Sequence, residues 1–390
     1  MKKIIIVNNN MKVGGVQKSL YNLLWEMDGK ADITLLLFGA VGPYMAKLPQ
    51  SVKVIACDSL FRYLGISQGE CRKHLPDAIK RGALAAMTRL FGRSAVMKLL
   101  LASQKMLPET YDCAISFLHN GREGNFYGGT QEFVLHRIRA HRKVAFLHCD
   151  YRNCGANYQA NNHLIGEFDR IAACSDGCRQ AFEQVLPDLT QRCVTVRNCH
   201  RFDEIQALAE ESPLVYDNTR LHVITVARLA HEKGVERAVE AVAYAAGQGI
   251  PVTLHIVGSG AMEESLRQLA LEQSTGAEFV FHGEQSNPYR YMKNADLFLL
   301  TSYHEAAPMV VEEARCLGLP VLTVETTSSH EMVTVQDCGW VCDNSLEALN
   351  ASLTQILGDC AGLRHMGRKL RRQKMDNAAA VEQFLKLIEG

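Results

Sequence analysis

The segment LHVITVARLAHEKGVERAVEAVAYAAGQGIPVTLHIVGSGAMEESLRQLA, residues 221–270, decides the fold class. β-branched runs at 221–227 and 252–257 alternate with stretches whose apolar residues recur at helical spacing. This alternation is typical of a parallel sheet covered by helices. We therefore predict an α/β fold whose strands are joined by helices.

The same alternation continues in both directions along the chain. Further strands are expected on the C-terminal side at 278–281, 297–300, 320–324 and 339–342. On the N-terminal side they are expected at 3–7, 33–38, 52–56, 112–117, 143–147, 170–173 and 194–197. Such a pattern predicts two doubly wound, Rossmann-like domains in tandem.

The two predicted domains are separated where the apolar rhythm is lost. Residues 199–219 are polar and acidic and contain Pro213, so we interpret them as a linker between domains at 1–198 and 220–374. We expect a C-terminal helix at 375–390 that packs back toward the first domain. Ligands of open parallel sheets bind beyond the carboxyl ends of the strands, so the expected site is a cleft between the two domains.

Composition excludes several classes of protein. The 390 residues are 47% hydrophobic and 22% charged, enough for a core in each domain. The 42 Lys and Arg balance the 42 Asp and Glu, so no overall field favours nucleic acid, which is not an expected partner.

Sequence features also bear on location. The apolar run before Asn8 is too short for a secretory signal, no stretch is long enough to span a membrane, and the 13 cysteines contain no Cys-x2-Cys pair. These features predict a cytoplasmic protein with reduced thiols, either free or peripheral on the inner face of the cell membrane.

One region departs from the even charge. Residues 72–105 contain eight Lys or Arg and the single acid Asp77. Apolar residues recur at helical spacing among them: Leu84, Met87, Leu90, Phe91 and Ala95. A basic amphipathic helix of this kind can lie on an anionic membrane surface, or it can be a solvated basic face over the core of the first domain. A second basic run at 361–375 is interpreted as a solvated face.

Two cations follow the strand predicted at 221–227. Arg228 lies just past this strand and Lys233 lies at the start of the next helix. A departing diphosphate requires positive donors of this kind, because negative charge grows on it as its bond to the sugar breaks. The alternative is a pair of surface cations near a turn.

The segment HEAAPMVVEEARCLGLPV, residues 304–321, contains a predicted anion site. Pro308 suits the first turn of a helix, so the unpaired backbone N–H groups of Ala306, Ala307 and Met309 would point outward. The N-terminus of a helix favours bound anions.

Two carboxylates belong to the same segment. Glu305 precedes the predicted helix and Glu313 lies about two turns into the pattern, so both can line one ligand. A carboxylate can hold two vicinal hydroxyls, which sugars offer. The alternative is a solvated acidic helix, and for Glu312 we favour it.

Glycines and a histidine complete the candidate residues. Gly258 opens a Gly-x-Gly turn, and Gly14 with Gly15 follows the first strand, so a backbone could approach phosphate or base closely at both places. No third glycine completes a dinucleotide fingerprint. His148 ends another strand. The alternative is that His148 has only a structural role, with its ring nitrogens hydrogen-bonded to backbone groups.

Together these residues resemble the family 4 glycosyltransferases of the GT-B fold, and the resemblance covers nearly the whole chain. Its most specific part is the Glu-x7-Glu pattern from Glu305 to Glu313, combined with Arg228, Lys233 and the sequence GLPV at 318–321. The resemblance implies that Arg228 and Lys233 grip the donor diphosphate, that Glu305 sits against the transferred sugar and that Glu313 takes the ribose hydroxyls.

The resemblance extends to further positions. It implies that Gly14 and Gly15 lie near the donor phosphates, His148 near the sugar and His282 near the nucleotide base. The family often has Gly and an aromatic residue where this chain has Ala306 and Ala307, so the contacts to the donor sugar differ.

The implied activity is retaining transfer of a hexose-type sugar, with a UDP-sugar as donor, to a hydroxyl of a glycan or lipid-linked acceptor in the synthesis of cell-surface polysaccharide or glycolipid. No metal and no cofactor besides the nucleotide sugar are expected, and the sequence contains no Asp-x-Asp. Two alternatives remain, a sugar-nucleotide epimerase of the same fold and a noncatalytic binder of sugar nucleotides.

Overall fold

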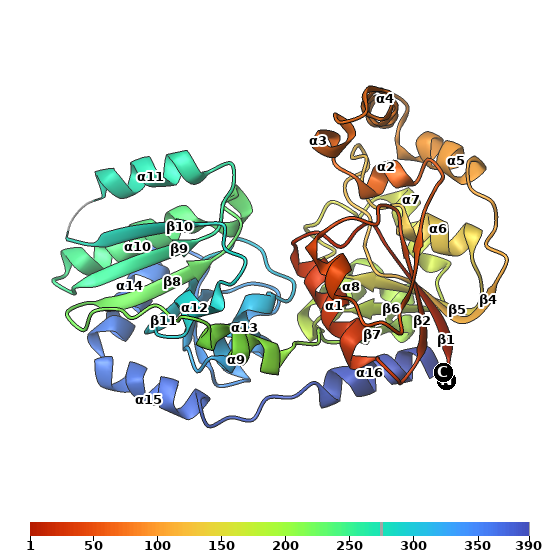
Figure 1. Ribbon diagram of the computed structural model, residues 1–390. Coiled ribbons are helices and arrows are strands. Elements are labelled where there is room, and N and C mark those ends of the chain that lie inside the picture. Colours follow the sequence, from red (N-terminus) through yellow and green to blue (C-terminus); the bar gives the residue numbers. More distant parts are fainter. Residues whose placement is uncertain (274–275, 390) are drawn as a thin grey trace. The chain divides into compact units, whose positions relative to one another are not determined.

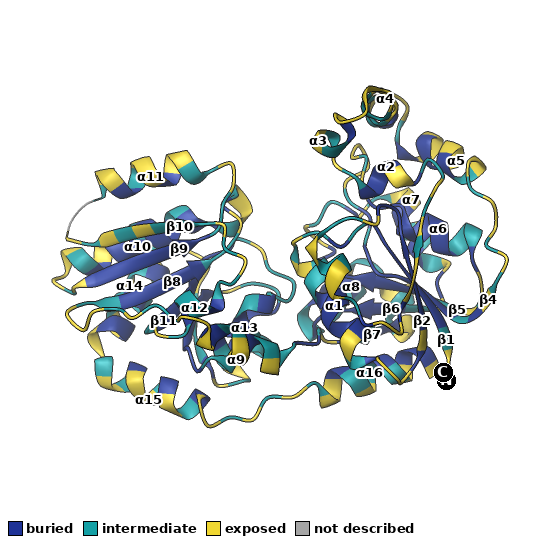
Figure 2. Cartoon of the chain, in the orientation of Figure 1, coloured by how far each residue is buried: buried dark blue, intermediate teal, exposed yellow. Residues whose placement is uncertain are grey.

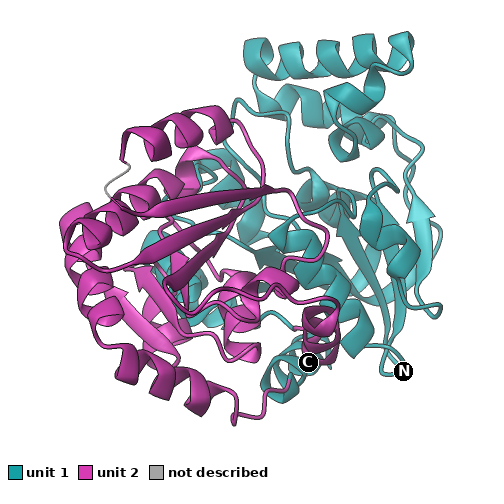
Figure 3. Ribbon diagram, turned by 60° about the vertical axis from the view of Figure 1, so that its left-hand side comes forward, with its two compact units in different colours: residues 1–199, 377–390 teal, residues 200–376 magenta. Residues whose placement is uncertain are grey.

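The computed structural model describes residues 1–273 and 276–389, which form two compact units (Figure 1). Unit 1 combines residues 1–199 with the C-terminal segment that begins at Asn377, and unit 2 comprises residues 200–376 (Figure 3). Each unit is built around one parallel sheet.

The sheet of unit 1 has the strand order β3-β2-β1-β4-β5-β6-β7. Its strands are β1 (Lys3–Asn8), β2 (Asp32–Leu37), β3 (Lys53–Ala56), β4 (Thr110–Ser116), β5 (Arg139–Leu147), β6 (Arg170–Ala173) and β7 (Cys193–Thr195). The order reverses direction between the neighbouring strands β1 and β4. Such a reversal is the usual ligand position of an open α/β sheet.

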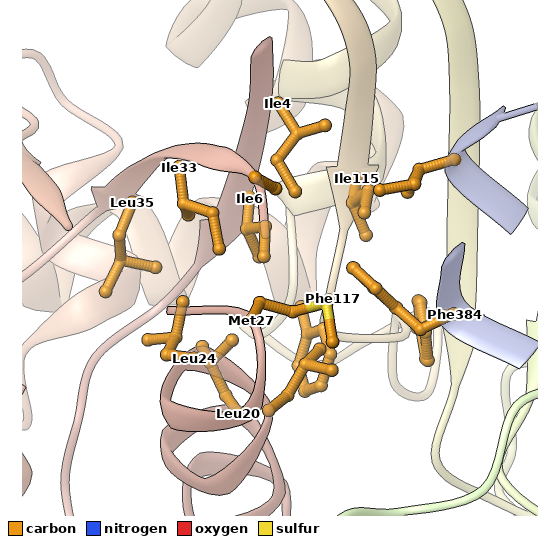
Figure 4. Close-up of a cluster of buried hydrophobic side chains, with 14 of the residues drawn as sticks. Ile4, Ile6, Leu20, Leu24, Met27, Ile33, Leu35, Ile115, Phe117 and Phe384 are labelled. Carbon is orange, nitrogen blue, oxygen red and sulfur yellow. The ribbon is translucent and has the colours of Figure 1, made fainter. Parts of the chain in front are cut away.

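Helices cover the sheet of unit 1. They are α1 (Gly15–Glu26), α2 (Arg62–Gly65), α3 (Gln68–Cys71), α4 (Leu75–Phe91), α5 (Arg93–Ala102), α6 (Thr130–Arg137), α7 (Gln159–Gly166), α8 (Asp176–Val185) and α16 (Ala378–Glu389), with 3-10 turns at Pro43–Lys47 and Pro187–Arg192. Helix α16 belongs to this unit because its Phe384 is fully buried in the same cluster as Ile115 and Phe117 (Figure 4).

The sheet of unit 2 has the strand order β10-β9-β8-β11-β12-β13. Its strands are β8 (Leu221–Val226), β9 (Val252–Val257), β10 (Glu278–Gly283), β11 (Leu297–Leu300), β12 (Val321–Val324) and β13 (Gly339–Cys342). Its helices are α9 (Phe202–Glu210), α10 (Val235–Gly247), α11 (Glu263–Glu272), α12 (Tyr289–Met292), α13 (Met309–Cys316), α14 (Leu346–Gly358) and α15 (Cys360–Leu370), with short turns at His231–Lys233 and His330–Thr334. In this sheet the order reverses between β8 and β11.

The central strands are buried on both faces (Figure 2). In β8, for example, Val223 and Ile224 are fully buried in different clusters, one on each side of the sheet. Strands of this kind read as continuous apolar runs, which explains why each strand predicted from the sequence is present. Where a strand differs from its prediction, only its ends differ, by a few residues.

The predicted linker at 199–219 is wrong for its first half. Residues 202–210 form α9, whose Ile205 and Ala209 are buried in the core of unit 2. The exposed side of this short helix is polar and acidic. Its composition therefore indicated a linker, although Ile205 and Ala209, four residues apart, form an apolar stripe.

The single basic helix predicted at 72–105 is also wrong. Gly92 adopts φ 78°, a left-handed conformation that ends α4 before α5 begins. Of the expected apolar face, Leu84 is buried in unit 1, whereas Leu90 and Phe91 are 76% and 68% exposed. Within the described parts of the chain, no helix is long and apolar enough to cross a membrane.

Candidate functional site

The loops that follow β8 and β11 of unit 2 carry a largely buried ion pair. Lys233 Nζ lies 2.7 Å from Glu305 Oε1, and the two side chains are only 27% and 9% exposed. Because β8 and β11 are neighbours at the reversal of strand order, residues 72 positions apart meet there. The structure therefore brings together two residues that the sequence analysis predicted separately.

Backbone contacts hold these two loops together. Gly234 has φ 57°, and a Cβ at this position would come within 2.3 Å of Thr301 O, so the close approach favours glycine. The Thr301 hydroxyl donates to Gly234 O at 2.7 Å, and Tyr303 N donates to Glu232 O at 3.1 Å. The rings of His231 and Tyr303 stack 5.3 Å apart. The residues on either side of Lys233 in the chain are thus held against the loop that follows β11.

Arg228 lies on the loop after β8 as predicted, but its contacts differ from those of Lys233. Its side chain is 69% exposed and pairs with Glu232. Exposed pairs of this kind are weak and exchange readily with solvent. A bound anion could therefore recruit the guanidinium from Glu232 at little cost.

Helix α13 places the second predicted carboxylate. Pro308 is the N-cap residue of this helix, one position before the first turn in which it was predicted. Glu313 lies in the second turn and is 4% exposed. Met309 is buried as the first residue of the helix, and Ala306 and Ala307 precede the N-cap residue.

Glu312 is less solvated than the sequence analysis predicted. Its side chain is 18% exposed and pairs with Arg315 at 3.3 Å on the same helix. The ion pair satisfies the carboxylate locally, so Glu312 has a partner of its own and does not join the pair of Lys233 and Glu305.

The turn after β9 packs against the turn after β8. Gly258 has φ 141° and donates its N–H to Gly283 O at 2.8 Å, and a Cβ on Gly258 would lie 1.9 Å from Ala227 O. Leu229 N in turn donates to Ser259 O at 2.9 Å. The Gly-x-Gly segment is therefore required where two loops of the carboxyl edge make contact.

His282 ends a row of three hydrogen-bonded histidines on neighbouring strands. His222 and His255 are joined at 3.0 Å, as are His255 and His282. His222 Nε2 also meets Asp217 O at 2.9 Å, and since a carbonyl only accepts, the neutral row must donate toward Asp217. This direction leaves His282 Nδ1 as a hydrogen-bond acceptor.

The predicted residues of unit 1 lie after its central strands. Gly14 is the N-cap residue of α1, and a Cβ on Gly15 would meet nothing within 4 Å, so the fold itself does not require Gly15. His148 follows β5 and stacks on Phe146 with ring centroids 5.6 Å apart. Its Nε2 is buried and has no hydrogen-bond partner within the described residues.

The sequence analysis missed several polar residues near the reversal of strand order between β1 and β4 of unit 1. Further buried polar atoms without a partner among the described residues are Asn8 Oδ1, Asn9 Oδ1, His119 Nδ1 and both amide atoms of Gln131. Asn8 ends β1 and Asn9 follows it, His119 lies after β4, and Gln131 lies in the first turn of α6. The position of His119 after the strand predicted at 112–117 matches that of His148 after its own strand, and this signal could have identified it.

Burial keeps three histidines of the two units neutral. It lowers the pKa of His119 to about 4, and burial together with the charge of His119 lowers the pKa of His148 to about 3. Burial, with contributions from His282 and His222, lowers the pKa of His255 to about 3. These rings act as uncharged hydrogen-bonding groups at neutral pH.

We predict that acid destabilises the protein through these histidines. Since the unfolded pKa is 6.5, the unfolded chain takes up protons that the folded chain rejects. Stability is therefore complete above pH 6.5 and falls toward the folded pKa values, by about 1.4 kcal/mol per pH unit for each histidine. Urea unfolding at pH 7.5, 6 and 5 measures this slope. His255→Gln should make the free energy of unfolding of unit 2 depend less steeply on pH. An unchanged dependence would contradict the assignment of this effect to His255.

Comparisons with solved structures agree with the fold. The solved structures of WaaG, a glycosyltransferase involved in lipopolysaccharide biosynthesis, and of Anabaena HepE with UDP and glucose superimpose with TM-scores of 0.63 and 0.67. They are 16% and 17% identical in sequence, and the alignments cover 99–100% of this chain and 100% of each of the two structures. Two Rossmann-like units of this kind define the GT-B fold, which this chain has.

The family model matches most of unit 2. Residues 209–377 match the family model described as glycosyl transferases group 1. The putative colanic acid biosynthesis glycosyltransferase WcaL of Salmonella typhimurium is 34% identical over 147 residues, which are 35% of this chain. The chain spans 36% of the length of that relative. The region matched by the family model contains Arg228, Lys233, Glu305 and Glu313.

Proposed function

We propose that this protein is a retaining glycosyltransferase that moves a hexose-type sugar from a nucleotide sugar, with UDP as the nucleotide, to a hydroxyl of a glycan or lipid-linked acceptor. The product would belong to cell-surface polysaccharide or glycolipid synthesis. The observation that carries the proposal is the Lys233–Glu305 pair at the strand reversal of unit 2, inside the region that matches group 1 glycosyl transferases.

The donor diphosphate would be held by Lys233, Arg228 and the N-terminus of α13. As the bond from sugar to diphosphate breaks, negative charge grows on the leaving oxygen, and fixed cations and helix amides stabilise it. Lys233 already has its ammonium positioned by Glu305. Glu305 would contact the transferred sugar, and Glu313 would accept hydrogen bonds from the ribose hydroxyls.

Unit 1 would supply uncharged groups. His148 and His119 are neutral at physiological pH, and their unpartnered nitrogens suit the hydroxyls of a sugar better than a charged ligand. Gly14 and Gly15 would let the backbone before α1 approach the donor phosphates. With retention, the acceptor hydroxyl attacks on the face from which the diphosphate leaves.

The choice of UDP rests on a known binder and on His282. Anabaena HepE was solved with UDP and glucose. His282 Nδ1, an acceptor at the end of the histidine row, would accept a hydrogen bond from a ring N–H of the base, a group that uracil and guanine offer but adenine and cytosine do not. The UDP bound to HepE favours uracil of these two.

A panel of nucleotides and nucleotide sugars tests the proposal. A ligand at 100 times its Kd stabilises the folded state by about 2.7 kcal/mol, so UDP should raise the unfolding temperature more than GDP, ADP or CMP do. UDP-hexoses should then release UDP when a glycan or lipid-linked acceptor is added. A new epimer formed without acceptor, or donor binding with neither transfer nor hydrolysis, would contradict the proposed activity.

We expect the activity to be independent of metal. If Lys233, Arg228 and the amides of α13 neutralise the leaving diphosphate, an excess of EDTA should change the initial rate of transfer by less than about twofold. Enzyme stripped of divalent ions and assayed with and without manganese provides the comparison. Loss of transfer in EDTA and recovery with manganese would mean that a divalent cation, and not Lys233, neutralises the leaving diphosphate.

A further inference from the structure

Helix α4 of unit 1 carries an apolar stripe that faces solvent. Leu75, Ile79, Ala83, Ala86 and Leu90 are all exposed and recur at intervals of three or four residues, so they lie on one side of the helix over about four turns. The three large side chains, Leu75, Ile79 and Leu90, are 70%, 62% and 76% exposed. Phe91, the last residue of the helix, is also 68% exposed, but at 100° per residue it lies outside this stripe.

This stripe is not the side of α4 that packs on the unit. Leu84 and Thr88, on the opposite side, are 5% and 2% exposed. Helix α4 is thus apolar on two sides, only one of which is covered. Single exposed apolar residues are ordinary, but a continuous stripe of them marks a contact surface.

Cations border the stripe. At 100° per residue, Lys80 lies beyond one edge of the stripe and Arg89 beyond the other, and Arg72 and Lys73 precede the helix. None of these four forms a salt bridge within the described residues. The acid of α4, Asp77, is turned away from the stripe and accepts a hydrogen bond from Tyr63 at 2.7 Å.

We propose that the exposed stripe of α4 docks in the plane of an anionic phospholipid bilayer. An apolar stripe bordered by cations matches the boundary between acyl chains and anionic headgroups, where apolar side chains insert and Lys and Arg meet phosphate. A nucleic acid would use the cations but leave the apolar stripe uncovered. The inference goes beyond transferase activity, because it concerns where unit 1 binds.

Vesicle sedimentation tests the surface. The full chain is mixed with vesicles of 30% phosphatidylglycerol and 70% phosphatidylcholine, and with vesicles of phosphatidylcholine alone. We expect the anionic vesicles to bind at least about tenfold more protein at low salt, and this excess to fall as NaCl is added. Ile79→Ser with Leu90→Ser should lower the partition coefficient at least about tenfold, and Lys80→Glu with Arg89→Glu should do the same.

Matched substitutions in unit 2 serve as controls. Leu271 is 72% exposed, and Arg372 belongs to the second basic run, so Leu271→Ser and Arg372→Glu change exposed residues of the same kind. Both controls should bind vesicles as the wild type does. Every variant should retain its unfolding temperature and its stabilisation by UDP, so a failure of membrane docking is separable from a failure of the proposed activity.

Three results would overturn the proposal. They are equal binding to anionic and neutral vesicles, wild-type binding by both α4 double variants, and an equal loss in the unit 2 controls. Competition by RNA that removes the protein from vesicles while the serine variants bind RNA normally would assign the cations to nucleic acid instead.

Discussion

Glu305→Gln should lower the initial rate of sugar transfer at least about a hundredfold, with little change in the unfolding temperature. The substitution keeps the shape of the side chain but removes the charge that lies 2.7 Å from Lys233 Nζ. Charge stabilisation at a bond-breaking centre is commonly worth a factor of this size. Initial rates with a UDP-hexose and an acceptor measure the effect.

Lys233→Ala removes the cation of the same ion pair. It should lower the initial rate of sugar transfer by at least as large a factor as Glu305→Gln does. Its ammonium is the more buried of the two predicted cations, so water replaces it poorly. Glu312→Gln is the matched control, because Glu312 lies on α13 and pairs with Arg315 instead of Lys233. We expect it to stay within about twofold of the wild type. Near wild-type rates of transfer in both Glu305→Gln and Lys233→Ala would contradict the assignment of the donor site to these two residues.

The second large effect is expected at Gly258. Its φ of 141° is one that side chains rarely adopt, and a Cβ would lie 1.9 Å from Ala227 O, which is backbone and cannot swing away. Gly258→Ala should therefore lower the free energy of unfolding of unit 2 by about 3 kcal/mol or more. Because Ala227 precedes Arg228, the displaced loop should also weaken the stabilisation by UDP.

Gly247→Ala provides the comparison for this prediction. Gly247 is the last residue of α10, and a Cβ there would meet nothing within 4 Å. Alanine should leave stability unchanged or raise it by up to about 1 kcal/mol. Urea unfolding followed by circular dichroism separates the two variants. Equal stability of Gly258→Ala and Gly247→Ala would show that the turn relaxes without strain.

The strands were predictable because their signal is local. A parallel strand buried on both faces is an apolar run bounded by turn residues, and β6, β9, β11 and β13 have the ends expected from the sequence. The helix α9 was missed because its two buried residues are outnumbered by polar and acidic neighbours. A short amphipathic segment is recognised only when the surface that covers it is known.

The residues of the candidate site were proposed one by one from the sequence, but the contacts between them could not be. Arg228, Lys233, Glu305 and Glu313 were identified from their order and spacing, which resemble a known family. Sequence spacing alone could not show that Glu305 contacts Lys233 while Arg228 turns to Glu232. The order of strands in the sheet decides this, since it makes β8 and β11 neighbours.

The sequence by itself determined the alternation of strands and helices, the identity of the polar residues at strand ends and the excess of cations at 72–105. Only the tertiary structure decided which of those residues meet, and which side of α4 remains uncovered. The physical reason is that periodicity shows that a helix has an apolar side, whereas burial depends on whether another element lies against it. In α4 both sides are apolar, and the packing of unit 1 covers Leu84 but leaves Ile79 and Leu90 in solvent.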